Sequence, residues 1–302
     1  MPMLEVLRSS VNTWECDQMG HLNVRHYFAR ANDGLAVLLL KLGLGPVQLR
    51  EQGLMLRARD QHVRFSRELR PGAAYSVHAG VVSQTESALI TYQELRTGNG
   101  EVCTTIITEL CLLDVSPLAL RAMPAAVLEA AQSVRCEIPS YGAARGVSRE
   151  PSHYRPTHHE AVERGLIGAY LGPLLADDCD ARGVMRESAC MARISDGIPH
   201  FFRALNEGPR PTGIGGAAVE YRFVFHDWPR ASDVIEVRSG LNAVGNKTLH
   251  MNHFIFNVET GHCIAASEAV AVWFDLNARK AVEMPADVRA QLATRVLAGL
   301  SL

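Results

Sequence analysis

Apolar residues recur along two stretches of the chain with the spacing of an α-helix. The stretches run through 28–42 and 191–205, and in both the large apolar side chains stand three or four residues apart. Such steps place side chains on one side of a helix, so the pattern predicts two helices with a buried stripe. The stripe positions are Phe28, Ala31, Leu35, Leu38, Leu39 and Leu42, then Met191, Ile194, Ile198, Phe201, Phe202 and Leu205.

After each predicted helix the sequence changes to runs of β-branched and aromatic residues that are broken by Gly, Pro and Asp. This sequence pattern is typical of strands joined by turns. The predicted strands are 61–68, 73–83, 87–97 and 101–114 in the first half and 218–226, 233–242, 248–259 and 262–275 in the second. One more strand is expected before each helix, at 4–14 and near 167–175. Each half is therefore predicted to contain a strand, a loop, a long helix and four antiparallel strands.

The two halves also share residue identities at a constant distance. The pattern Cys-Asp-x-x-Gly occurs at 16–20 and at 179–183, which is an offset of 163 (179 − 16). Because a copied fold keeps its pattern while most identities drift, we interpret the chain as an internal duplication. The same offset matches Ala29 with Ala192, Arg30 with Arg193, Asp33 with Asp196, Gly34 with Gly197 and Leu42 with Leu205.

Length and composition fit two units of similar size. The chain has 302 residues, of which 47% are hydrophobic, enough for two compact domains. We predict domains at 1–131 and 164–302, joined by a linker at 132–163 that is rich in Pro, Gly, Ser, Arg and His. The linker histidines His153, His158 and His159 lack a set of Cys or carboxylate partners at zinc spacing. We therefore predict no metal and no resident cofactor.

Charge and cysteine content argue against several classes of protein. The net charge of −2 provides no concentrated basic face for a nucleic acid. Seven cysteines without a CxxC pair suit a reducing compartment. The N-terminus shows no secretory signal, and the longest apolar run, 35–40, is far shorter than the roughly 20 residues of a membrane span. We expect a cytoplasmic protein without nucleic-acid or membrane partners.

Two loop sequences invite a functional interpretation. The string GIGG at 213–216 precedes a predicted strand, whereas a dinucleotide-binding loop follows one, so we interpret it as a turn. The string CDQMGHLN at 16–23 precedes the first helix. It resembles the Asp-x-x-Gly-(His)-x-Asn loop of hotdog-fold acyl-CoA thioesterases, especially the 4-hydroxybenzoyl-CoA thioesterase-like branch. The resemblance implies an α+β fold in which each half is an antiparallel sheet wrapped around a long central helix, so the tandem copy implies a double hotdog.

The resemblance also implies an activity, the hydrolysis of an acyl-CoA thioester in which CoA is part of the substrate. Asp17 would attack the thioester or act as a base for water, and backbone N–H groups near Gly20 and His21 would polarise the carbonyl. A thiol with a pKa near 8.5 leaves with little acid assistance, so these are the main requirements. The simpler alternatives stay open: Asp17 could only order a turn, and Asn23 could only cap the helix.

The second copy of the loop departs from this pattern. Asp180 and Gly183 are kept, but the position of His21 is taken by Val184 and that of Asn23 by Arg186. Asp180, Gly183 and Arg186 therefore form a second candidate site that is either weakened or specialised, and we expect the first copy to carry the main activity. The resemblance also allows a homodimer of these two-unit chains.

Two other functions are alternatives to hydrolysis. Hotdog hydratases, which also act on acyl-CoA, place four residues between their Asp and His and carry an Asn-Pro, whereas Asp17 and His21 have three residues between them and no Pro. A non-catalytic acyl-CoA-binding regulator should bring a DNA-binding segment, and neither the first residues nor the linker contains one. The sequence therefore favours a thioesterase.

Overall fold

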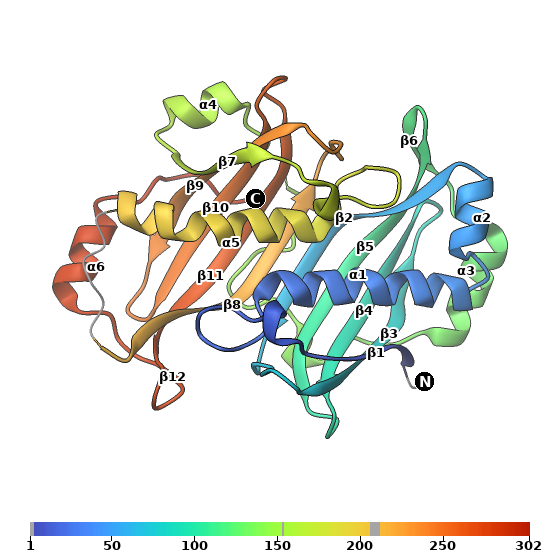
Figure 1. Ribbon diagram of the computed structural model, residues 1–302, viewed down its shortest axis with the longest axis horizontal. Helices are drawn as coiled ribbons and strands as arrows, with labels where there is room; N and C mark the ends of the chain where they lie inside the picture. The colour runs from blue at the N-terminus through green and yellow to red at the C-terminus, as the bar shows by residue number, and fades with distance from the viewer. Residues whose placement is uncertain (1–2, 153, 206–211) are drawn as a thin grey trace. The chain divides into compact units, whose positions relative to one another are not determined.

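The computed structural model describes residues 3–152, 154–205 and 212–302, so His153 lies outside the described residues. Figure 1 shows its helices and strands. The contacts between Cα atoms group the chain into two compact units, Met1–Ala143 and Ala144–Leu302. The division falls inside the segment predicted as the linker.

The first unit is an antiparallel sheet with a long helix on one face. Its strands follow the order β1-β3-β4-β5-β2, and β6 pairs with β5. The 18-residue helix α1 contacts β1, β3 and β4, and crosses the sheet in Figure 1. The elements are β1 Leu4–Ser10, η1 Thr13–Glu15 (a 3₁₀ turn), α1 Val24–Lys41, α2 Pro46–Glu51, β2 Leu54–Phe65, β3 Ala74–Gln84, β4 Ala88–Thr97, β5 Val102–Val115, β6 Leu118–Arg121, α3 Ala125–Ala131, η2 Gln132–Val134 and η3 Ser140–Gly142.

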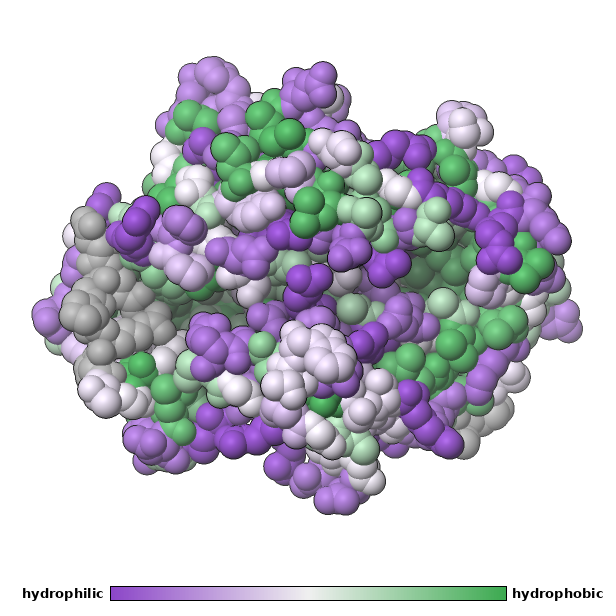
Figure 2. Space-filling model, viewed as in Figure 1, coloured by the Kyte–Doolittle hydropathy of each residue, from purple (hydrophilic) through white to green (hydrophobic). Residues whose placement is uncertain are grey.

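The second unit has the same plan. Its strands follow the order β8-β11-β10-β9-β7, with β12 on β11, and the 18-residue helix α5 contacts β7 and β9. Asp196, His200 and Arg203 of α5 are exposed. Figure 2 shows hydrophilic residues over the place of this helix. The elements are α4 His158–Glu163, β7 Ile167–Pro173, η4 Ala176–Asp178, α5 Glu187–Ala204, β8 Ile214–Phe225, β9 Val234–Val244, β10 Thr248–Asn257, β11 Cys263–Asp275, β12 Lys280–Ala281 and α6 Ala286–Ala293.

The internal duplication extends to the element boundaries. The helices α1 and α5 begin 163 residues apart (187 − 24), and the same offset relates β1 to β7 and η1 to η4. The strands β2 and β8 begin 160 residues apart (214 − 54), as do β3 and β9, and β4 and β10. The second copy is thus three residues shorter between its long helix and the next strand.

The apolar stripe of the first helix faces its sheet. All six predicted positions are buried, from Phe28 to Leu42, and four of them, Leu35, Leu38, Leu39 and Leu42, join β-strand residues in one hydrophobic cluster. In the second helix Met191, Ile194, Phe201 and Leu205 are buried, while the other two predicted positions are half-buried. Burying such side chains contributes roughly 1.5–3 kcal/mol each before ordering entropy is subtracted, so each stripe holds its helix on the sheet.

Three predicted boundaries are wrong. The strand expected at 4–14 ends at Ser10, because Asn12 and Glu15 close the 3₁₀ turn η1 by a hydrogen bond from Asn12 N–H to the Glu15 carboxylate. The strand expected at 61–68 starts earlier, at Leu54, and ends at Phe65. The GIGG string is mostly strand, since β8 begins at Ile214 and only Gly213 precedes it, with a positive φ of 82°.

A segment near the end of each unit crosses the back of its sheet over a glycine. In the first unit Arg135 bridges Val81, and in the second Val296 bridges Leu241. A Cβ on Gly80 would lie 2.6 Å from the Cys136 sulfur, and one on Gly240 would lie 2.6 Å from a Leu300 methyl. Both glycines therefore permit a close crossing that a side chain would block.

One buried polar position differs between the sheets. Gln93 on β4 donates to the backbone carbonyl of Ala31 in α1, at 2.9 Å. Its counterpart on β10, His253, is fully buried, lies 2.7 Å from the Ser239 hydroxyl and faces the Phe201 ring of α5. Burial lowers the pKa of His253 to about 3, so the imidazole is neutral in the folded protein.

We therefore expect acid sensitivity from His253. Below the unfolded-state pKa of about 6.5 the unfolded chain binds a proton that the folded chain does not, so stability falls as the pH is lowered toward 3. Wild type should lose about 2 kcal/mol more free energy of unfolding than His253→Gln between pH 7 and pH 5, measured by urea denaturation. Equal losses in both proteins would contradict this assignment.

Candidate functional site

The loop that precedes α1 holds Asp17 in a tight turn. The Asp17 carbonyl accepts from Gly20 N–H at 3.0 Å, and Asp17 N–H donates to the His21 carbonyl at 3.0 Å. One carboxylate oxygen, Oδ1, accepts from Met19 N–H at 2.8 Å. Gly20 has a φ of 76°, which favours glycine because L side chains are strained there. Asp17 therefore does order its turn, through its carboxylate oxygen Oδ1.

The other oxygen of Asp17 faces a histidine that has a second carboxylate on its far side. His21 Nδ1 lies 3.4 Å from Asp17 Oδ2, and His21 Nε2 lies 3.3 Å from Glu68 Oε1. The side chains of Asp17 and His21 are each 19% exposed and that of Glu68 is 28% exposed, so all three are partly accessible to solvent. Such an arrangement can orient the imidazole between the two carboxylates.

Glu68 reaches this place through the loop between β2 and β3. Leu22 N–H donates to the Leu69 carbonyl at 2.8 Å, which fixes that loop against the Asp17 turn. Tyr27 is buried in α1, and its hydroxyl accepts from Leu69 N–H at 3.2 Å while its ring packs edge-on against Phe65. Tyr27 therefore packs in the core and supports the loop.

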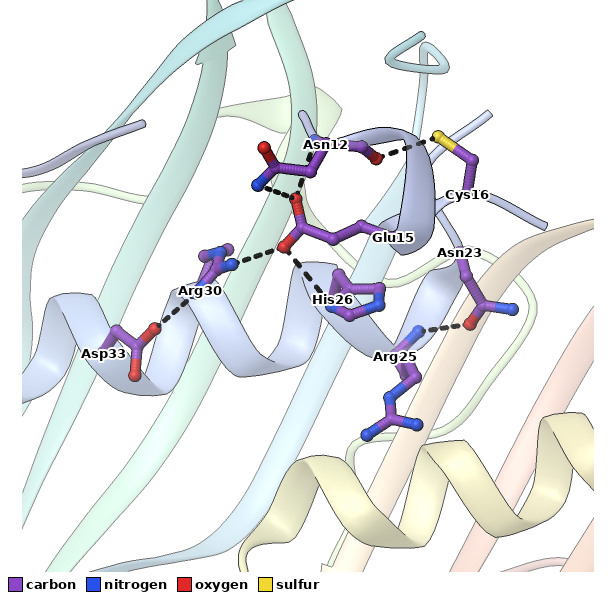
Figure 3. A network of polar contacts seen from close by, with 8 residues as sticks. All are labelled: Asn12, Glu15, Cys16, Asn23, Arg25, His26, Arg30 and Asp33. Carbon is purple, nitrogen blue, oxygen red and sulfur yellow. Dashed lines mark hydrogen bonds and ion pairs between the residues drawn. The ribbon is translucent and has the colours of Figure 1, made fainter. Parts of the chain in front are cut away.

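A buried ion pair fastens the start of the Asp17 loop to α1 (Figure 3). Glu15 is 3% exposed, and its carboxylate accepts from Arg30 at 2.5 Å and from Asn12 N–H at 2.8 Å. Arg30 also donates to Asp33 at 3.1 Å, and His26 lies 3.7 Å from Glu15. Burial alone would raise the pKa of Glu15, but the bonds from Asn12 and Arg30 outweigh it and lower this pKa, so the carboxylate is charged.

Asn23 caps the helix at the other end of the same loop. Its side chain accepts from Arg25 N–H at 3.0 Å, and its own N–H donates to the Glu15 carbonyl at 2.9 Å. Gly20 N–H donates to the Asp17 carbonyl. That backbone N–H groups near Gly20 and His21 polarise a substrate carbonyl stays a prediction. Val24 is the first residue of α1, so its N–H has no acceptor within the helix.

The second copy keeps the turn without the histidine and its partner. Asp180 Oδ1 accepts from Arg182 N–H at 2.8 Å and from Val184 N–H at 3.1 Å, and Gly183 has a φ of 72°. Val184, the counterpart of His21, is 1% exposed and apolar. Arg186 precedes α5 with an exposed side chain that makes no cap hydrogen bond. Since β2 and β8 differ by 160, the counterpart of Glu68 is Trp228.

The buried ion pair, by contrast, is present in both copies. Asp178 is 3% exposed and accepts from Arg193 at 2.6 and 2.7 Å. Arg193 also donates to Asp196 at 2.7 Å, and Asp178 accepts from Leu175 N–H at 3.0 Å. This repeats the arrangement of Glu15, Arg30 and Asp33 at an offset of 163.

Two of the linker histidines lie beside carboxylates. His158 Nε2 lies 2.5 Å from Glu236, and exposed His159 lies 3.2 Å from Glu163. Within the described ranges, no group of three His, Cys, Asp or Glu side chains is arranged to hold a metal ion. Likewise, none of the helices in the described part of the chain combines the length and hydropathy needed to cross a bilayer.

Comparison with known proteins identifies the family. The thioesterase-like superfamily matches residues 11–131 and 174–292, which include both Asp-x-x-Gly loops, so the chain belongs to this superfamily. No curated protein matches the chain. The family, with the structures below, confirms the resemblance to hotdog-fold thioesterases with a tandem layout, and it supports thioester hydrolysis as the general reaction.

Solved structures share the fold over most of the chain. A Lactobacillus plantarum protein described as an oleoyl thioesterase has a TM-score of 0.69 at 11% identity, covering 90% of this chain and 97% of its own. The 12:0-ACP thioesterase of Umbellularia californica has a TM-score of 0.64 at 11% identity, covering 88% and 93%. An acyl-ACP thioesterase of Bacteroides thetaiotaomicron has a TM-score of 0.62 at 9% identity, covering 88% and 96%.

Sequence reasoning missed two parts of this site. Glu68 lies 47 residues beyond His21 (68 − 21), and no local spacing links them. Glu15 was also missed, although a signal existed. Arg30 and Asp33 repeat at +163, and an acidic residue stands at both 15 and 178. Repeated charges on a helix and in the preceding loop could have suggested an ion pair.

Substitution of the loop glycines tests the turn geometry. A Cβ on Gly20 or Gly183 would meet no atom within 4 Å, so the cost of alanine comes from the positive φ alone. We expect Gly20→Ala and Gly183→Ala each to lower the free energy of unfolding by about 1–2 kcal/mol in chemical denaturation. Asparagine, which tolerates this φ, should cost less at both positions. Unchanged stability in the alanine variants would show that the turns relax.

Proposed function

We propose that this protein hydrolyses acyl-CoA thioesters to free acid and CoA, with its catalytic centre in the first unit and the double-hotdog arrangement as its scaffold. The observation that carries the proposal is the alignment of Asp17, His21 and Glu68 in the loop before α1. Membership of the thioesterase-like superfamily supports the reaction class.

In the proposed reaction Asp17 acts on the thioester carbonyl carbon. Its Oδ2 either attacks that carbon directly or takes a proton from a water that attacks it. The C–S bond then breaks, and the CoA sulfur leaves as a thiolate. If water attacked, the free acid has formed at this point, and the thiolate takes up the proton that Asp17 removed from the water. If Asp17 attacked, water then hydrolyses the acyl–Asp17 anhydride, which releases the acid, restores the carboxylate and supplies the proton of the thiol. N–H groups in the first turn of α1, beginning with Val24, are proposed to stabilise the developing oxyanion. His21, held by Glu68, keeps Asp17 oriented and can relay the proton.

We propose that the second unit contributes no equivalent centre. Asp180 Oδ1 accepts hydrogen bonds from two backbone N–H groups. The residues at the positions of His21 and Glu68 are Val184 and Trp228. A valine cannot hold or relay a proton, and an indole N–H only donates. The two copies therefore provide an internal comparison of the same turn with and without the histidine and the second carboxylate.

The central test compares the two aspartates. Asp17→Ala should lower kcat/KM for acyl-CoA hydrolysis by at least about a hundredfold, since it removes the reacting group. Asp180→Ala should stay within about twofold of wild type. Free thiol release from short-chain, long-chain and aromatic acyl-CoA esters measures both, and circular dichroism checks that each variant folds.

Several outcomes would contradict the proposal. Full activity in Asp17→Ala with loss in Asp180→Ala would move the centre to the second unit. The wild-type protein could release no thiol from any CoA ester but hydrolyse acyl groups that are attached to acyl carrier protein. In that case the carrier of the substrate is acyl carrier protein and not CoA. If neither carrier is a substrate, the protein binds thioesters without hydrolysing them or has another activity.

The role of Glu68 is tested separately. Glu68→Gln keeps the size of the side chain but removes the charge beside His21 Nε2, so we expect kcat to fall about tenfold. The matched control is Glu101→Gln, because Glu101 pairs with Arg67 at 3.0 Å on the exposed surface of the same unit. That variant should keep wild-type kcat. Equal kcat in all three proteins would remove Glu68 from the site.

A further inference from the structure

Glu15 is connected to both ends of the segment that carries Asp17. Its carboxylate accepts from Arg30 in the second turn of α1 and from Asn12, just after β1, and is 3% exposed (Figure 3). Its backbone carbonyl accepts from Asn23 N–H, at the point where the loop enters the helix. One residue thus joins the strand exit, the helix body and the helix start, two positions before Asp17.

The second copy keeps each of these links through another acid. Asp178 binds Arg193 with both oxygens, its carboxylate accepts from Leu175 N–H, and its backbone carbonyl accepts from Arg186 N–H at 2.9 Å. The buried pair was kept in a loop from which the histidine and its partner carboxylate are absent. The pair therefore belongs to the construction of the loop in both units, whereas only one of the loops has the complete set of reactive side chains.

We propose that Glu15 and Arg30 are positioning residues for Asp17, which set the place of its carboxylate for hydrolysis in the first unit; this proposal rests on the proposed function. The pair makes no contribution as a proton donor or acceptor to the substrate. It acts by holding the loop against α1, so that Asp17 Oδ2 stays in line with His21.

The physical reason is the sensitivity of catalysis to small displacements. A reacting group that moves by about 1 Å can lose about a hundredfold in rate, whereas binding of the remote part of the substrate is little affected. Loss of the pair should therefore act on kcat. Loss of the Asp178–Arg193 pair in the second unit loosens a loop that lacks the histidine. It should therefore change stability but not kcat.

The experiment uses the full chain and four neutralising variants. Glu15→Gln and Arg30→Met should lower kcat about 10- to 100-fold while KM changes less than about threefold. Their matched controls, Asp178→Asn and Arg193→Met, should lower the melting temperature by a similar amount but keep kcat within about twofold. The conservative variant Glu15→Asp should retain most of the activity, because aspartate makes the same pair at 178.

A double-mutant cycle separates positioning from general damage. If Glu15 acts through Asp17, Glu15→Gln should produce no further loss of kcat when it is added to Asp17→Ala. Wild-type kcat in Glu15→Gln, equal kcat losses in Glu15→Gln and Asp178→Asn, or a full additional loss in the double variant would each overturn the proposal. Undiminished hydrolysis in Asp17→Ala would instead overturn the proposed function, so the two failures are distinguishable.

Discussion

Each unit of this protein is organised by one ion pair. A buried carboxylate that precedes the Asp-x-x-Gly turn pairs with an arginine from the long helix. A charge that is removed from water must be paired and hydrogen-bonded, and breaking such a buried pair typically costs about 3–5 kcal/mol. Glu15 and Asp178 meet this requirement with arginines 15 residues further along the chain. Because the pair joins the 3₁₀ turn to the helix, the path of the intervening loop is restricted, and with it the location of the Asp-x-x-Gly turn.

Comparison of the two copies separates the residues that build the loop from the residues that we propose react. Both keep the buried pair, the aspartate and the left-handed glycine, at Gly20 and Gly183. Only the first has His21 with a carboxylate on each side. The sheet beneath the helix diverges too: Gln61 on β2 hydrogen-bonds Asn32 of α1, whereas Tyr221 at the corresponding place on β8 stacks on Phe223. At this position a polar hydrogen bond in one copy is thus replaced by aromatic packing in the other, and the fold is kept.

Local patterns predicted most of the fold. The helical stripes follow from three- and four-residue spacing, and the strands from β-branched runs between turns, so both long helices and the main strands stand near their predicted places. The errors occur where tertiary contacts override local preference. The strand expected at 4–14 ends at Ser10 because Glu15 folds back onto Asn12. Gly215 and Gly216 join β8 because they pair with β11.

The sequence by itself determined the duplication, the buried helix faces and the two Asp-x-x-Gly loops, because these depend on spacing within short segments. Only the tertiary structure decided which charged residues meet. Glu68 arrives beside His21 from a different loop, and Glu15 becomes a buried partner of Arg30 instead of a solvated surface acid. The reason is physical: the energy of a charge depends on its burial and its neighbours, and these are set when distant segments pack together.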